Sequence, residues 1–191
     1  MSTRSTWRYD RDQVTSPHGV VAAKHELAAE AGADVLREGG NAVDAVVTAG
    51  FVAGVVEPFM SGLGGGGFLV AHFPERGERI VVDHAMVAPA AATPGMYPLA
   101  ESGTDADMFG WHKVAGDSNI HGHLAAGVPG TVAGLTLALD EFGTLSRQRA
   151  LAPAIKHAAD GFDVSWHTAL MIGLDLALLN RFPATRATFT H

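Results

Sequence analysis

Asp83 and His84 are the side chains whose types and order most readily suggest chemistry. They directly follow the apolar run RIVV, so a carboxylate and an imidazole stand together at the end of a predicted buried strand. Loops that leave buried strands often carry binding residues, and an imidazole can exchange a proton near neutral pH. An equally good interpretation is that the pair only turns the chain and bonds to the backbone, and both interpretations stay open.

A run of glycines is the second chemical candidate, since glycine fills five of the six positions of residues 62–67. The spacing Gly-x-Gly-x-x-Gly formally matches the dinucleotide-binding fingerprint. That fingerprint also has an acidic residue about 20 residues further along the chain, and Asp83 stands near this position. That fingerprint needs a strand before the glycines and a helix after them, whereas here an apparent helix precedes and the strand-like FLVAHF follows. We therefore interpret the glycines as residues that let helix, turn and strand backbones approach closely.

The histidines give no recognisable metal site. His121-Gly-His123 could place two imidazoles on one face of a strand, but no third ligand stands at a familiar spacing. The sequence HEL at His25 lacks the second histidine of a zinc-binding helix, and no G-x-S-x-G nucleophile turn occurs. We expect no metal, no cofactor and no catalytic nucleophile within this chain.

Composition excludes several classes of function. The 191 residues carry a formal net charge of −7 without a basic cluster, which argues against a nucleic-acid partner. The absence of cysteine excludes a disulfide framework, thiolate zinc sites and a cysteine nucleophile. The apolar run of residues 42–56 is too short to span a bilayer, which needs about 20 apolar residues. The N-terminus has no secretory signal pattern, so we expect no membrane association and a cytoplasmic location.

The elements expected in the first half run from a loose arm to a hairpin. Residues 1–18 form the arm, and GVVAAKH from Gly19 has the content of a short buried strand. An amphipathic helix should follow and stop at Gly39-Gly40. Asn41 should cap a second helix that is apolar on nearly every side and therefore buried. Residues 68–83 read as a hairpin.

Helices dominate the second half. Residues 84–100 suit an extended segment, TVAGLTLALDEFG and a segment starting near Ser146 read as helices, and WHTALMIGLDLALLNRF reads as one more before a polar end. The visible strands are too few to lie between so many apolar helices. The pattern therefore indicates the N-terminal part of a larger α/β fold, with α+β and a small sheet as the alternative.

Several long blocks resemble one family. The segments GGNAVDA, EPFMSGLGGGGF, GVPGTVAGL and LAPAIKHAADGFDVS are closely similar to the large-subunit half of the γ-glutamyltranspeptidase family. The resemblance implies that residues 19–191 form part of the large-subunit domain, incomplete at its C-terminus, of a four-layer αββα N-terminal-nucleophile hydrolase. It also implies a precursor that cleaves itself, and a small subunit as partner in a heterodimer or a dimer of heterodimers.

The resemblance also implies a mechanism and a class of substrate. The new N-terminal threonine of the small subunit would attack a small-molecule amide or peptide and form an acyl-enzyme. In the family the acyl group is γ-glutamyl. The nucleophile is expected beyond this chain, and we regard Thr190-His191, which echoes the nucleophile motif, as a coincidence because it comes too early.

One motif departs from the family pattern and sets the candidate substrate-binding residues. The family's Asp-x-Arg-Glu-x-Ala-Pro, whose arginine pairs with the glutamyl α-carboxylate, corresponds here to Asp83-His84-Ala85-Met86-Val87-Ala88-Pro89. A missing clamp of this kind costs about 2 to 5 kcal/mol of binding energy. Asp83, His84 and Ala85 are the site candidates.

Three hypotheses follow from this departure. The first is a divergent acyltransferase or amidohydrolase with altered acyl specificity. The second is a γ-glutamyl enzyme in which His84, or an arginine elsewhere, binds the carboxylate. The third is a non-catalytic relative that acts as a scaffold.

Overall fold

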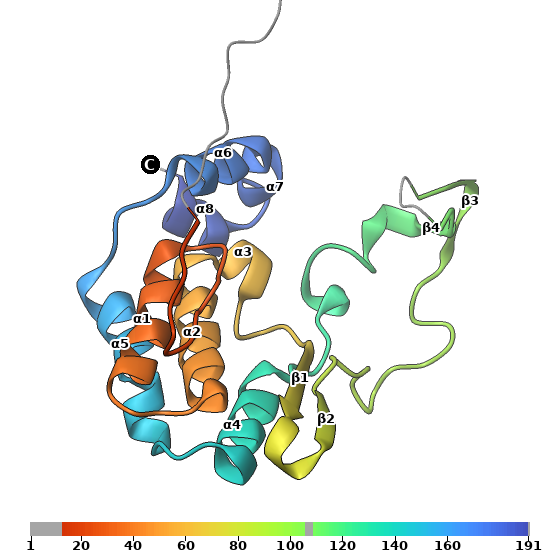
Figure 1. The fold of residues 1–191 in the computed structure, drawn as a ribbon. Helices are drawn as coiled ribbons and strands as arrows, with labels where there is room; N and C mark the ends of the chain where they lie inside the picture. Colours follow the sequence, from red (N-terminus) through yellow and green to blue (C-terminus); the bar gives the residue numbers. More distant parts are fainter. Residues whose placement is uncertain (1–12, 106–108, 191) are drawn as a thin grey trace, which may run out of the picture.

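The computed structural model describes residues 13–105 and 109–190, which form a helical layer, two small hairpins and a helical end (Figure 1). The helices are α1 (Glu26–Arg37), α2 (Ala42–Val56), α3 (Pro58–Ser61), α4 (Thr131–Phe142), α5 (Arg147–Asp160), α6 (Trp166–Leu174), α7 (Leu176–Leu179) and α8 (Pro183–Phe189). The strands are β1 (Phe68–Phe73), β2 (Glu78–Asp83), β3 (Leu99–Thr104) and β4 (His112–Val114). Three 3-10 turns complete the described elements: η1 (Pro74–Arg76), η2 (Ala115–Asp117) and η3 (His123–Ala125). Helices and two small sheets make up the described chain, in agreement with the predicted α/β class.

Helix α2 is the centre of the helical layer. A capping box begins it: the side chain of Asn41 accepts hydrogen bonds from the N–H groups of Val43 and Asp44, and the Asp44 carboxylate accepts one from Asn41 N–H. Helices α1, α4 and α5 all pack against α2 (Figure 1). The burial predicted for this helix is confirmed for most of its residues, and Ala42 and Val46 are exposed exceptions.

The hairpin of β1 and β2 lies beside α4 (Figure 1). Its strands are antiparallel and in register from Phe68 opposite Asp83 to Phe73 opposite Glu78. Leu69 and Val82 are buried on one face and join the helical core. On the opposite face, large apolar side chains are exposed to solvent, namely Phe68, Val70 and Val81. The predicted hairpin is confirmed, and half of it lacks a cover among the described residues.

The second hairpin, β3 with β4, is antiparallel with an irregular register and stands away from the helical layer (Figure 1). β3 begins at Leu99, at the end of the segment predicted to be extended, and continues with β4 into residues 101–120, for which the sequence predicted no element. Among the described residues, no helix is long and apolar enough to cross a membrane.

The strand predicted from Gly19 is wrong. Residues 13–25 contain no strand, and residues 1–12 of the predicted arm lie outside the described residues. The segment lies along α1 instead: a Cβ added at Gly32 would lie 2.9 Å from Cγ1 of Val21. Val21 packs against this helix whereas Val20 is exposed, and no neighbouring strand in the described chain offers a ladder of hydrogen bonds.

The prediction for the C-terminal helices is also partly wrong. The predicted apolar helix is divided into α6 and α7, because the chain leaves the helical conformation locally at Asp175. The polar end contains a short helix that the sequence did not predict, α8, which starts with Pro183 at its first position. The predicted helices over residues 26–37, 131–142 and 147–160 are confirmed, with Ser146 as the N-cap of the last.

Candidate functional site

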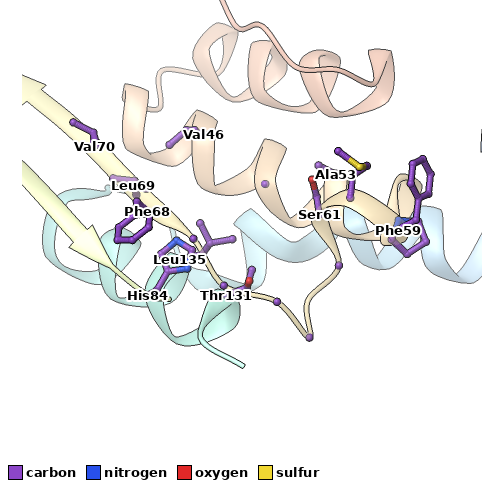
Figure 2. Close-up of a pocket in the computed structure, with 18 residues that line it drawn as sticks. Val46, Ala53, Phe59, Ser61, Phe68, Leu69, Val70, His84, Thr131 and Leu135 are labelled. Carbon is purple, nitrogen blue, oxygen red and sulfur yellow. The ribbon is translucent and has the colours of Figure 1, made fainter. Parts of the chain in front are cut away.

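Three segments that are distant in sequence meet where the β1–β2 hairpin ends. They are the glycine loop (residues 62–67), the hairpin exit (residues 83–87) and the helix entrance (residues 127–134), and together we call them the glycine junction. Figure 2 shows His84 of the hairpin exit and Thr131 of the helix entrance lying beside the glycine loop. The junction contains all three predicted site residues.

Backbone hydrogen bonds hold the junction together. Gly67 and His84 exchange two of them, with N···O distances of 3.2 and 3.0 Å, which extends the hairpin ladder by one pair. The carbonyl of Gly65 accepts from the N–H groups of Gly130 and Thr131 at 2.9 and 3.1 Å. The start of α4 is therefore bound to the glycine loop directly, and no side chain stands between the two backbones.

This closeness explains the glycines. A Cβ added at Gly66 would lie 2.6 Å from the backbone nitrogen of Met86, and one at Gly130 would lie 2.1 Å from the carbonyl oxygen of His84. Neither backbone atom can rotate away. The interpretation of the glycines as sites of close backbone approach is supported, and the order of helix, glycines and strand excludes the dinucleotide fingerprint at this loop.

His84 turns its side chain toward α4. A Cβ added at Gly134 would lie 2.2 Å from Cβ and 2.3 Å from Cγ of His84, and one at Gly67 would lie 3.1 Å from its Cε1. The imidazole thus occupies a slot that two glycines open. Its Nδ1 is buried and forms no hydrogen bond with the described residues, whereas Nε2 is not enclosed in this way. His84 is the only ionisable side chain among the described residues that line the adjoining hollow.

Asp83 and Ala85 lie on the open side of the hairpin exit. The Asp83 carboxylate accepts a hydrogen bond of 3.0 Å from the N–H of Ala85, and both residues are exposed. Asp83 therefore turns the chain, as the second interpretation expects, and it forms no hydrogen bond with the His84 ring in the described structure. Met86, at the position of the family's glutamate, is 55% exposed.

A hollow of about 640 Å³ adjoins the junction (Figure 2). Its walls come from one face of α2, from α3, from the glycine loop and from β1, and His84, Thr131 and Leu135 close one end. No lysine or arginine lines it within the described chain. A ligand carboxylate in this space would therefore meet no lysine or arginine among the described lining residues.

Asp44 links the start of α2 to the segment that follows α4, a role that its sequence position did not reveal. It is buried and accepts four hydrogen bonds, from Asn41 N–H, from the N–H and hydroxyl of Thr144, and from Leu145 N–H. Burial raises the pKa of the Asp44 carboxyl, but these hydrogen bonds outweigh burial and hold the pKa below its ordinary value. The carboxylate thus joins the start of α2 to the end of α4.

Glu57 is a second buried carboxylate that sequence reasoning did not single out. It is 4% exposed at the junction of α2 and α3, and its Oε1 lies 3.4 Å from Nζ of Lys24. Lys24 also lies over the ring of Phe59, 5.3 Å from its centroid. The sequence Glu-Pro directly after an apolar helix could have indicated this buried carboxylate, because a charge at that position must either face solvent or find a partner.

The histidines of residues 121–123 do not form the strand pair that the sequence allowed. His121 lies in a bend and His123 starts the 3-10 turn η3. The described residues contain no cluster of three or more histidine or acidic side chains that could hold a metal ion.

Comparison with known proteins identifies the family. The family model described as gamma-glutamyltranspeptidase matches residues 28–191. The glutathione hydrolase proenzyme of Bacillus subtilis (strain 168) is 44% identical over 146 residues, which cover 76% of this chain and 23% of that protein. The acylase ACY 1 proenzyme of Pseudomonas sp. (strain V22) is 36% identical over 179 residues, which cover 93% of this chain and 31% of that protein.

Solved structures agree with the sequence comparisons. The γ-glutamyltranspeptidase of Helicobacter pylori superposes with a TM-score of 0.81 at 35% identity, over 92% of this chain and 47% of that chain. The fold is thus that of an N-terminal-nucleophile hydrolase, as predicted. The chain spans about a quarter of the length of the Bacillus relative. On these grounds it belongs to the γ-glutamyltranspeptidase family.

Proposed function

We propose that this chain is the large-subunit part of an enzyme that transfers or hydrolyses an amide-linked acyl group, and that its acyl specificity differs from γ-glutamyl. One observation carries the proposal. Where the family motif has an arginine and a glutamate, the exposed hairpin exit presents Ala85 and Met86, beside a hollow without lysine or arginine in the described chain. The similarity to an acylase proenzyme also supports an acyl specificity other than γ-glutamyl.

The proposed reaction uses a nucleophile outside this chain. Self-cleavage of the precursor would expose a threonine whose α-amine takes the hydroxyl proton while Oγ attacks the amide carbonyl. The C–N bond breaks, the leaving amine carries the proton away, and the acyl group stays on the threonine as an ester. Water or an amine then attacks this ester, releases the acyl group and returns the proton to the hydroxyl.

The residues of this chain would select the acyl group. An arginine that pairs with a carboxylate through two hydrogen bonds favours α-carboxylate donors, and its absence removes about 2 to 5 kcal/mol of that preference. Ala85 leaves space, and Met86 offers a flexible apolar contact. An acyl group with a neutral or apolar body suits these two side chains better than a glutamyl group does.

The test compares acyl donors on the full-length gene product. Intact mass and N-terminal sequencing should first show two fragments, the smaller one starting with threonine. Anilides of neutral acyl groups should then give a higher kcat/KM than the γ-glutamyl anilide, and Ala85→Arg should raise kcat/KM for the γ-glutamyl anilide alone. A folded Ala85→Arg variant without that gain would show that Ala85 does not determine the specificity.

The second candidate keeps the γ-glutamyl reaction, and the 44% identity to a glutathione hydrolase proenzyme favours it. It needs another anchor for the carboxylate, yet His84 packs its ring against Gly134 on the helix side. If this candidate holds, millimolar glutamate should raise the melting temperature of the full-length protein, because a ligand of the native state stabilises it. A single uncut chain that is inactive on every donor would instead support the scaffold hypothesis.

A further inference from the structure

A hollow of about 260 Å³ lies between α3 and the C-terminal helices. Figure 1 shows α6, α7 and α8 gathered beyond α3, and Figure 2 shows the ring of Phe59 pointing away from His84. The far wall comes from residues spaced as neighbours on one helical side, namely Met171, Ile172, Asp175 and Leu179. Only Pro58 and Phe59 also line the hollow beside the glycine junction.

Apolar groups dominate the lining of this hollow. Phe59 and Phe189 contribute phenyl rings that are 38% and 39% exposed, and the far wall adds aliphatic side chains. Thr168 also lines the space, but its hydroxyl is already hydrogen-bonded to Oγ of Ser165 at 3.0 Å. The volume is just below the range of about 300 to 1,000 Å³ for pockets that hold drug-sized ligands. The hollow therefore has room for the apolar body of a small molecule.

Asp175 is the one charged side chain among the described residues that line this hollow. It is exposed, and its carboxylate forms no ion pair or hydrogen bond with the described part of the chain. Lys24 lies over the Phe59 ring, 5.3 Å from its centroid, but its Nζ is also 3.4 Å from Oε1 of Glu57. Because Glu57 balances that positive charge, the hollow presents one uncompensated negative charge beside apolar walls.

We infer that this hollow binds a small organic ammonium ion, with its apolar body between α3 and α6 and its charged nitrogen at the Asp175 carboxylate. Aromatic rings suit the same ligand, because the face of a ring attracts a cation. A ligand carboxylate would meet Asp175 as a like charge, and a neutral apolar molecule would leave Asp175 unpaired. The bound ion would contact α3, the short helix that leads into the glycine loop.

Fluorine NMR of the full-length gene product tests the site, with 4-fluorobenzylamine as the ammonium probe and 4-fluorobenzyl alcohol as its neutral match. We expect the amine to bind about three- to fivefold more tightly than the alcohol, the ratio for an ion pair that water partly reaches. Asp175→Asn should remove this preference, whereas Asp163→Asn, which changes an exposed carboxylate outside the hollow, should keep it. A preference that survives Asp175→Asn would overturn the inference. Failure of both probes to bind would also overturn it, because another part of the protein would then fill the hollow.

A filling variant tests where the apolar body of the probe lies. Met171→Trp places a larger side chain in the hollow and should weaken the binding of both probes by about tenfold. Unchanged affinities in the folded variant would refute the inference, and if the variant does not fold, the comparison of Asp175→Asn with Asp163→Asn still decides. Neither readout needs activity or self-cleavage, so amine binding to an inactive, uncut precursor would support the site while contradicting the proposed function.

Discussion

The sharpest perturbation available is Gly134→Ala, because one methyl group tests the whole arrangement of the glycine junction. The new Cβ would lie 2.2 Å from Cβ of His84, 2.3 Å from Cγ and 2.5 Å from Cδ2. Rotating the imidazole cannot relieve the shortest contact, since Cβ is fixed by the backbone. Either α4 or the hairpin exit must move, and both are bound to the glycine loop.

Two opposing effects set the magnitude. Alanine in place of glycine stabilises the middle of a helix by about 1 kcal/mol. Overpacking of a rigid site costs about 1 to 3 kcal/mol, and occasionally more. A contact this short with an immobile atom belongs at the upper end of that range, so we expect a net loss of about 2 kcal/mol in the free energy of unfolding.

A double-mutant cycle on the full-length gene product separates this cause from others. Unfolding free energies from denaturant titration should show that His84→Gly recovers most of the loss, since it removes the clashing Cβ, whereas His84→Ala, which keeps it, recovers little. If Gly134→Ala is neutral or stabilising, the close approach is refuted. If His84→Ala rescues as well as His84→Gly, the contact involves the ring and the reasoning about Cβ is wrong.

Three further predictions concern the same framework, with thermal unfolding midpoints as the measurement. Gly66→Ala should strongly destabilise the protein and Gly64→Ala should not, because an added Cβ meets backbone atoms 2.6 Å away at the first position and nothing within 4 Å at the second; equal shifts would contradict this. Asp44→Asn should destabilise by about 2 to 4 kcal/mol at pH 7. Because the folded pKa of Asp44 is lowered, its contribution is present above the unfolded pKa and is lost as pH falls through the folded value, so the difference between wild type and variant should narrow below about pH 4; a constant difference would exclude a titrating Asp44. Asn41→Ala should cost about 1 to 2 kcal/mol through the lost cap, and Asn41→Ser should restore most of it.

Sequence patterns predicted the elements whose causes are local. The Asn41 cap, the Gly143 stop of α4 and the Ser146 cap of α5 each depend on residues within one helical turn, and all three stand where expected. The hairpin was equally predictable, because both of its strands and its turn lie within residues 68–83.

Features that depend on distant segments escaped prediction. The apolar content of residues 19–25 indicated burial, but whether such a segment joins a sheet or lies on a helix depends on its neighbours in space. The role of Asp44 was not predicted, since nothing local in the sequence shows that Thr144 and Leu145 come to it. The slot around His84 needed the same information, because Gly67 and Gly134 belong to separate elements.

The site was predicted only as a set of positions. The motif comparison located Asp83, His84 and Ala85 at the hairpin exit. The structure shows that these three neighbouring residues make different contacts. Asp83 bonds to the backbone, His84 packs against α4, and Ala85 is exposed. Side-chain direction at the end of a strand depends on what packs behind it, which a linear motif does not contain.

The hydrogen bonds of Asp44 also determine when helix α2 can dock into the core during protein synthesis. The carboxylate caps α2 at its first turn, yet its partners Thr144 N–H and Leu145 N–H come 100 and 101 residues later. A ribosome must therefore release the whole intervening chain before this buried charge obtains its full set of donors. Until then the start of α2 holds a carboxylate that prefers water, which delays docking of the helix into the core. The segment around α2 in the nascent chain should thus gain resistance to protease only after Leu145 has left the exit tunnel.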